Sequence, residues 1–125
     1  MKRIFTFLFV VCFGNVAFSQ IVVQFQKPSS WSSNVGIHWW AESPTSCVPP
    51  SNNSTWPTSL LSMTDAGGGY YIAHFPSGCS SFNILFIDKN NQNNKTNDIV
   101  GVSSSMNYDA SGMGGGTITV SGTAI

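Results

Sequence analysis

Apolar and polar side chains alternate along several short stretches of the chain, which is the pattern of β-strands with one buried face. In IVVQFQ, Ile21, Val23 and Phe25 fall on one side of an extended backbone. Similar apolar segments are VGIHWW (residues 35–40), GYYIAHF (69–75) and SFNILFID (81–88). Almost no segment carries a helical repeat of apolar positions. The pattern therefore predicts strands over these four stretches.

Turn-forming residues separate the predicted strands. KPSSWSSN and PSGCS are turn regions, and AESPTSCVPPSNNST and KNNQNNKTN are longer polar loops. Two closing strands are predicted over NDIVGV (97–102) and TITV (117–120), with the glycine-rich GMGGG between them. Many short strands between turns indicate an all-β fold. We predict a single antiparallel β-sandwich of the immunoglobulin-like type.

The stretch VGIHWW contains two of the four tryptophans of the chain. Successive side chains of a strand point to opposite faces, so Val35, Ile37 and Trp39 point one way and His38 and Trp40 the other. The first set is purely apolar and is expected in the core. We therefore expect His38 and Trp40 on the solvent side, where exposed aromatic groups favour a binding surface. The alternative is that the following loop covers Trp40 and buries it in a satellite cluster.

The N-terminal region has a different composition. Two basic residues precede the apolar run IFTFLFVVCF, and the small residues Ala17 and Ser19 follow shortly after it. This is the layout of a secretory signal peptide, so we expect residues 1–20 to be removed and residues 21–125 to form the domain. The apolar run is short for a membrane span. Acylation of Cys12 in a lipoprotein, or retention as an anchor, are the alternatives.

The charge of the expected domain argues against one class of partner. Without residues 1–20, three basic and five acidic residues remain, a net charge of −2. Nucleic-acid binding normally needs a basic surface, so we expect no nucleic-acid partner. Few charges together with abundant Ser, Thr, Asn and Gly favour neutral, hydroxyl-rich partners. The predicted signal peptide, residues 1–20, indicates a secreted or cell-surface location, extracellular or periplasmic.

Two cysteines, Cys47 and Cys79, remain in the expected domain. Export to an oxidising compartment makes a disulfide between them the expected state. The loop that it closes contains about 32 residues, for which chain entropy predicts roughly 3 to 4 kcal/mol of stabilisation. A catalytic Cys–His arrangement is the alternative, but an exported thiol with a second cysteine available usually oxidises.

A third aromatic residue, Trp56, directly precedes Pro57, whose ring restricts the backbone. Trp40 and Trp56, held at an angle, would form a curved platform on which a pyranose ring can stack. The coiled chain of an α-1,4-glucan fits such a platform better than the flat ribbon of cellulose does, and each tryptophan offers about 150 to 250 Å² of contact area. The loop QNNKTN, with Gln92 and Lys95, supplies polar groups for the sugar hydroxyls.

Five segments in order carry a family resemblance: IVVQFQKPSSW, NVGIHWWA, TWPTSLLSM, GGYYIAHF and FNILFIDKNNQNNKTNDI. Over residues 21–99 the chain resembles the starch-binding carbohydrate-binding modules of family 26, with kinship to family 25. The resemblance implies a β-sandwich that binds starch or glycogen α-glucans and maltooligosaccharides without cutting them, in support of a secreted amylase. It implies an aromatic platform and a hydrogen-bonding loop, which here correspond to His38, Trp40, Trp56, Gln92 and Lys95.

The chain departs from the family pattern at three places. His38 stands where the family often has Tyr, which gives a smaller ring that can both stack and hydrogen-bond and predicts a lower affinity. Thr58 follows the Trp-Pro pair where Gly is frequent. The loop carrying Cys47 is longer than the family pattern predicts, so it would narrow or cover the site.

An enzyme and a protein-interaction domain are the alternatives from other classes. Glycoside hydrolysis usually needs two carboxylates about 5 to 10 Å apart. No nucleophile elbow, zinc motif or phosphate loop is present, so we expect no catalysis and no cofactor. In an adhesion domain, Trp40 and Trp56 would anchor a protein partner. The acids show no evident pairing: Glu42, Asp65, Asp88, Asp98 and Asp109.

Metal binding is disfavoured by the spacing of the possible ligands. Asp88, Asn90 and Gln92 alternate as the oxygen ligands of a calcium loop do, but no second acid is placed at the end of the loop as that geometry requires. His38 and His74 lie on different predicted strands, and two histidines alone do not specify zinc. We therefore expect no metal site.

Overall fold

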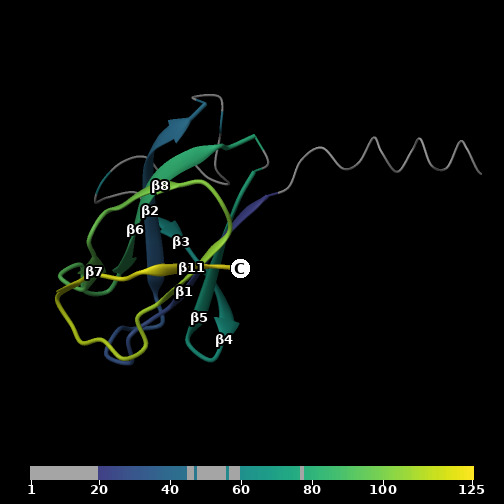
Figure 1. The fold of residues 1–125 in the computed structure, drawn as a ribbon. Helices are drawn as coiled ribbons and strands as arrows, with labels where there is room; N and C mark the ends of the chain where they lie inside the picture. Colours follow the sequence, from purple (N-terminus) through teal and green to yellow (C-terminus); the bar gives the residue numbers. More distant parts are fainter. Residues whose placement is uncertain (1–19, 45–46, 48–55, 57–59, 77) are drawn as a thin grey trace, which may run out of the picture.

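The computed structural model describes residues 20–44, 47, 56, 60–76 and 78–125. Within this part of the chain the regular structure consists of strands in two sheets (Figure 1). The first sheet has the order β11-β9-β1-β5-β4, and the second has the order β10-β7-β6-β2-β3, with β8 also paired to β6. The first sheet contains β1 (Ile21–Gln26), β4 (Thr64–Gly67), β5 (Tyr70–Phe75), β9 (Met106–Asp109) and β11 (Gly122–Ala124). The second contains β2 (Val35–Ser43), β3 (Leu61–Ser62), β6 (Ser81–Asp88), β7 (Lys95–Thr96), β8 (Ile99–Val102) and β10 (Thr117–Ile118).

The four segments of clear apolar patterning form β1, β2, β5 and β6 and lie inside the two sheets, so the all-β prediction is confirmed. Strand β2 continues three residues beyond Trp40, as far as Ser43, which the sequence assigned to a loop. Ala41 has a positive φ of 55° there, and the register with β6 shifts between Trp40 and Ser43. The irregularity interrupts the alternation, so the pattern did not reveal the extension.

Both sheets are mixed, so the prediction of a purely antiparallel sandwich is wrong in this respect. Strand β1 pairs with β9 in parallel, and β7 pairs with β10 in parallel, whereas the other pairings are antiparallel. In both parallel pairs, the later strand reaches its neighbour through a long connection and not through a hairpin. A tight hairpin imposes the antiparallel direction, whereas a long connection permits either direction.

The remaining strands are two to four residues long, and alternation over so few positions is uninformative. Strands β3, β4, β9 and β11 were not predicted, and β7 lies inside the predicted polar loop at residues 89–97. The two predicted closing strands are shorter than expected, since β8 begins at Ile99 and β10 ends at Ile118. Tertiary pairing with longer neighbours therefore decides where these short strands form.

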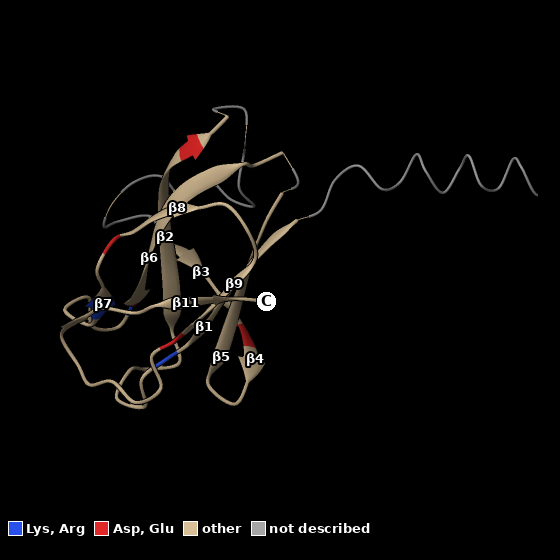
Figure 2. Cartoon of the chain, in the orientation of Figure 1, with Lys and Arg blue, Asp and Glu red and all other residues tan. Residues whose placement is uncertain are grey.

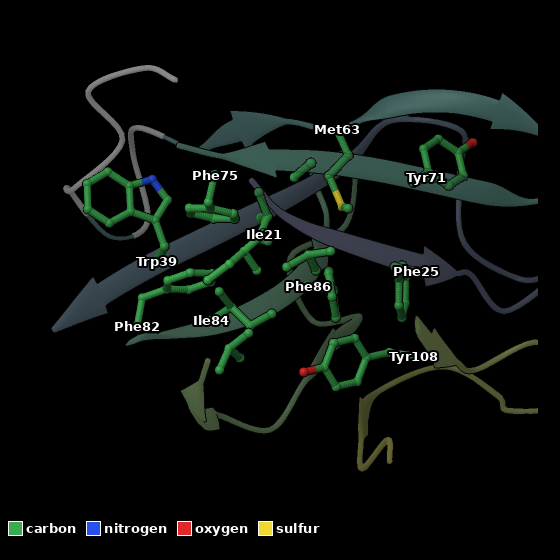
Figure 3. Packing of buried hydrophobic residues seen from close by; sticks show 14 of the residues in the cluster. Ile21, Phe25, Trp39, Met63, Tyr71, Phe75, Phe82, Ile84, Phe86 and Tyr108 are labelled. Atoms are coloured by element: carbon green, nitrogen blue, oxygen red, sulfur yellow. The ribbon is translucent and has the colours of Figure 1, made fainter. Parts of the chain in front are cut away.

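The core lies between the two sheets and is rich in aromatic rings (Figure 3). Phe25 of β1 stacks on Phe86 of β6, with ring centroids 4.2 Å apart. Phe75 of β5 stacks on Phe82 of β6, with centroids 4.0 Å apart. Trp39 lies at one end of this cluster and is only 7% exposed, so its predicted place in the core is confirmed.

Trp31 is a core residue that the sequence pattern missed. It lies in a predicted turn but is 3% exposed, and its ring lies 5.4 Å from that of Phe25. The backbone amide of Trp31 donates to the carbonyl of Pro28 (3.1 Å), and the ammonium of Lys27 donates to the carbonyl of Trp31 (3.0 Å). Alternation detects buried residues only in strands, so a buried side chain on a turn escapes it.

The predicted disulfide between Cys47 and Cys79 is present, and both cysteines belong to the core. It joins the chain beyond β2 to the turn between β5 and β6, close to a hydrogen bond from the amide of Ser80 to the carbonyl of Ser43 (2.8 Å). The amide of Cys47 also donates to the carbonyl of Pro44 (2.9 Å). The disulfide therefore ties the chain after β2 to the chain before β6, beside the end at which Ser43 pairs with Ser81.

The predicted leader, residues 1–20, lies outside the described residues except for Gln20 and stays a prediction, as does the domain boundary after it. In the ranges that the structure describes, no helix is long and apolar enough to cross a membrane.

Candidate functional site

Strands β2 and β6 lie side by side and have a second face that points away from the core. In their antiparallel register, His38 lies opposite Leu85, and Trp40 lies opposite Asn83. None of these four residues belongs to the core cluster, whereas Trp39 between them does. The strand parity inferred for residues 35–40 is therefore correct, and it places His38 and Trp40 on the outer face of the second sheet.

Three aromatic rings meet on this outer face. The imidazole of His38 lies 5.2 Å from the ring of Trp40, at an interplanar angle of 20°. It lies 5.3 Å from the ring of Trp56, at an angle of 49°. The two indole planes therefore cannot be parallel, because they are inclined to the same imidazole by different angles. Trp56 comes from a segment well beyond β2 and completes an angled group of aromatic rings; the residue is 39% exposed.

His38 is more covered than its position on the outer face suggested. It is 8% exposed, so the expectation that it faces solvent is wrong. The two indoles contact the imidazole and leave little of it open, whereas Trp40 keeps partial exposure. We therefore interpret His38 as the support between the tryptophans, with the indoles forming most of the exposed aromatic surface.

A hollow of about 320 Å³ opens beside these rings. Leu85 of β6 and Lys95 of β7 contribute to its lining, and Asp98 adds a carboxylate from the link between β7 and β8. The ammonium of Lys95 lies 5.4 Å from the centre of the Trp56 ring, which is a cation–π distance. The described residues that line it are His38, Trp40, Trp56, Leu85, Lys95 and Asp98.

The structure thus brings together four of the five site residues predicted from the sequence: His38, Trp40, Trp56 and Lys95. Gln92 is exposed in the turn between β6 and β7 and does not line the hollow. Its role in binding stays a prediction.

Sequence reasoning missed two residues that line the hollow. Leu85 was detectable, because the alternation that puts Ile84 and Phe86 in the core puts Leu85 on the outer face. Asp98 had no comparable signal, because it lies in a two-residue link between short strands. Only the pairing of β7 and β8 with β6 brings this carboxylate to the outer face.

The environment of His38 favours its neutral form. Burial lowers the pKa of the imidazole, and the negative charge of Asp98 raises it by a smaller amount, so that the pKa lies below its ordinary value. Nδ1 of His38 is buried and has no hydrogen-bond partner among the described residues. At neutral pH the imidazole is therefore an uncharged flat ring between the two indoles.

In the loop considered for calcium, the carboxylate of Asp88 accepts hydrogen bonds from other residues of the protein. Asp88 is buried and accepts hydrogen bonds from the amide and hydroxyl of Ser32 and from the amide of Asn90. These hydrogen bonds occupy the carboxylate oxygens and connect the turn after β1 to the turn after β6. In the described part of the chain, no three His, Cys, Asp or Glu side chains come together to hold a metal ion.

The sequence matches the family of starch-binding module 26, CBM26, over residues 23–99. This chain belongs to that family. The matched segment contains all three aromatic residues of the site together with Lys95 and Asp98. The resemblance inferred from the ordered motifs is therefore confirmed, and CBM26 is a family of non-catalytic binding modules.

Two solved structures show the same fold. One is CBMbc, of family CBM26, from Eubacterium rectale Amy13K in complex with maltoheptaose, with 15% identity and a TM-score of 0.63. The similarity covers 86% of this chain and 50% of that one, so this chain spans about half of its length. The other is CBM25-2 of the beta/alpha-amylase from Paenibacillus polymyxa, with 19% identity, a TM-score of 0.50, and coverage of 85% and 91% respectively. No curated protein matches the sequence.

Proposed function

We propose that this CBM26 module binds α-1,4-glucans of starch or glycogen by stacking glucose units on Trp40 and Trp56. The observation that carries this proposal is the hollow beside two indoles that both contact His38 and are not parallel to each other. A glucose ring presents a face of C–H groups to an aromatic ring, and successive units of an α-1,4 chain turn relative to one another. An angled pair of rings therefore suits a coiled chain.

Polar groups around the indoles provide for the sugar hydroxyls. Lys95 is held near Trp56 and can donate to a hydroxyl of a glucose unit stacked there. The side-chain amide of Gln92, in the turn that precedes Lys95, is a second proposed hydrogen-bonding group. Because the imidazole of His38 is neutral at neutral pH, the sugar does not have to displace water from an ionised group beneath it.

The distribution of acids supports binding without hydrolysis. Hydrolysis of a glycosidic bond usually needs two carboxylates about 5 to 10 Å apart. Among the described residues that line the hollow, Asp98 is the one acid. A single carboxylate beside an aromatic platform supports recognition, in agreement with the non-catalytic character of the family.

The biological setting is proposed from the leader and from the similar structures. The bound maltoheptaose in the Eubacterium rectale structure supports an α-glucan as ligand. The Paenibacillus polymyxa module belongs to a beta/alpha-amylase, which supports a role in holding a secreted amylase on its substrate. One weak site gains effective strength when several modules or an attached enzyme act on the same polymer. We propose that the module is secreted or displayed at the cell surface.

The test is retention on insoluble starch of the wild type, Trp40→Ala and Trp56→Ala. Each substitution removes one stacking face, so most of the retention is expected to be lost while the far-ultraviolet circular dichroism spectrum stays unchanged. Val100→Ala is the matched control, because Val100 is an exposed apolar residue that does not line this hollow. Titration with maltoheptaose measures the same losses in solution.

Two results would contradict the proposal. Retention that survives both tryptophan substitutions would place the glucan site elsewhere. A folded wild type that is not retained on starch would leave Trp40 and Trp56 as anchors for a protein partner, as in an adhesion domain.

A further inference from the structure

Charged residues are few and are spread over the sheets and turns (Figure 2). The carboxylates of Asp65 and Asp109 each accept a hydrogen bond from the amide two residues further along, at 2.8 and 2.9 Å. Asp88 accepts several hydrogen bonds, as described above. Asp98 accepts none from the described residues. It is thus the one aspartate of the four whose carboxylate accepts no hydrogen bond within this part of the chain.

The lysines among the described residues also differ in whether their ammonium groups form hydrogen bonds within the protein. Lys27 donates to the carbonyl of Trp31 (3.0 Å), and Lys89 donates to the hydroxyl of Ser62 (2.9 Å). The ammonium of Lys95 instead lies over the Trp56 ring, and it makes no hydrogen bond or ion pair with the described residues, including Asp98. Lys95 and Asp98, whose charged groups make no hydrogen bond with the described residues, therefore line the same hollow.

The backbone on both sides of Asp98 is held in place. The amide of Asn97 donates to the carbonyl of Ile118 (2.8 Å), and its side chain donates to the hydroxyl of Thr119 (2.6 Å). On the other side, Ile99 pairs with Ile84 of β6. Asp98 lies between these two anchored residues with its own side chain exposed. Because the backbone at Asp98 is already held in place, it loses little conformational entropy when a ligand binds.

We propose that Asp98 is a glucan-contacting residue whose carboxylate accepts hydrogen bonds from two neighbouring hydroxyls of a glucose unit on the platform. This inference rests on the proposed function. A carboxylate has two acceptor oxygens, and its hydrogen bonds are strengthened by the charge. With Lys95 as a donor near Trp56, the hollow offers both an acceptor and a donor to a neutral polyol.

The decisive variant is Asp98→Asn, measured by calorimetric titration with maltoheptaose at pH 7. Asn keeps the shape of the side chain and one oxygen acceptor but removes the charge and the second acceptor. We expect affinity to fall about tenfold, because hydrogen bonds to charged groups are the stronger class. The thermal midpoint is expected to stay that of the wild type, since Asp98 accepts no hydrogen bond from the described residues.

Asp65→Asn is the matched control. It makes the same chemical change on the first sheet, and an Asn there can still accept the hydrogen bond from the amide of Gly67. This variant is expected to bind maltoheptaose as the wild type does. An equal loss of affinity in both variants would reflect net charge alone and would overturn the assignment of Asp98.

A second readout needs no glucan. The negative charge of Asp98 raises the pKa of His38, so Asp98→Asn is expected to lower the midpoint of the imidazole titration followed by NMR. Wild-type affinity in Asp98→Asn would overturn this inference and leave the proposed function standing. Failure of the wild type to bind maltoheptaose would remove both.

Discussion

At the scale of single residues, Asp88 shows how a buried charge is satisfied in this fold. It is 2% exposed, and burial by itself would raise the pKa of its carboxyl group. Hydrogen bonds from Ser32, Asn90 and Asn94 together outweigh that effect and hold the pKa below its ordinary value. The folded state therefore stabilises the ionised form, and the carboxylate joins the turn after β1 to the turn after β6.

Asp88→Asn is expected to lower the free energy of unfolding at pH 7 by about 2 kcal/mol, because a neutral amide replaces an ionised acceptor of several donors. The folded pKa is lower than the unfolded value of about 3.9, so this stabilisation is complete above the unfolded pKa and is lost as pH falls through the folded pKa. Urea unfolding at several pH values measures it. A difference between wild type and variant that stays constant down to the most acid pH would contradict this account.

At the scale of elements, strand β2 serves the core and the site at once. Trp39 points between the sheets, and its neighbours His38 and Trp40 point to the hollow. The long antiparallel register with β6 fixes which residues take each face. A shift of one residue in this register would move the core residues of β2 to the outer face and the site residues to the core. The packing of Ile37 and Trp39 in the core therefore also determines where the aromatic platform lies.

The two faces of β2 predict opposite effects for adjacent tryptophans. Trp39→Ala is expected to reduce the free energy of unfolding by about 3 to 5 kcal/mol, because a large aromatic side chain is lost from the core. Trp40→Ala is expected to have a much smaller effect on stability while losing retention on starch. Denaturant unfolding of both variants provides the comparison. A larger loss of stability from the Trp40 variant would mean that the faces are assigned the wrong way round.

At the scale of the whole molecule, the disulfide closes a long loop of the chain. Cys47 and Cys79 are 32 positions apart in the sequence, and the loop between them includes Trp56, β3, β4 and β5. Closing this loop limits the conformations of the unfolded chain far more than it limits those of the folded chain.

A Cys47→Ser, Cys79→Ser double variant is expected to lose roughly 3 to 4 kcal/mol of stability, the chain-entropy value for a loop of this length. Urea unfolding of the wild type with and without a reducing agent is the parallel measurement, and the two losses should agree. If the double variant unfolds at the same urea concentration as the oxidised wild type, the disulfide does not stabilise the fold.

Local sequence patterns were sufficient to predict the all-β class, the strands β1, β2, β5 and β6, the two faces of β2 and the cysteine pair. Each rests on local chemistry: a period of two places residues on faces, and export favours oxidation of thiols. The ordered motifs also indicated the starch-binding family, which the match over residues 23–99 confirms.

The folded chain was needed to establish the parallel pairings, the short strands, the burial of Trp31 and His38 and the place of Asp98. These features depend on partners distant in the sequence. Trp56 and Trp40 cover His38, Phe25 packs against Trp31, and β6 brings the link that carries Asp98 to the hollow. Periodicity records which side of a strand a residue occupies, whereas exposure also depends on what the rest of the chain packs against that side.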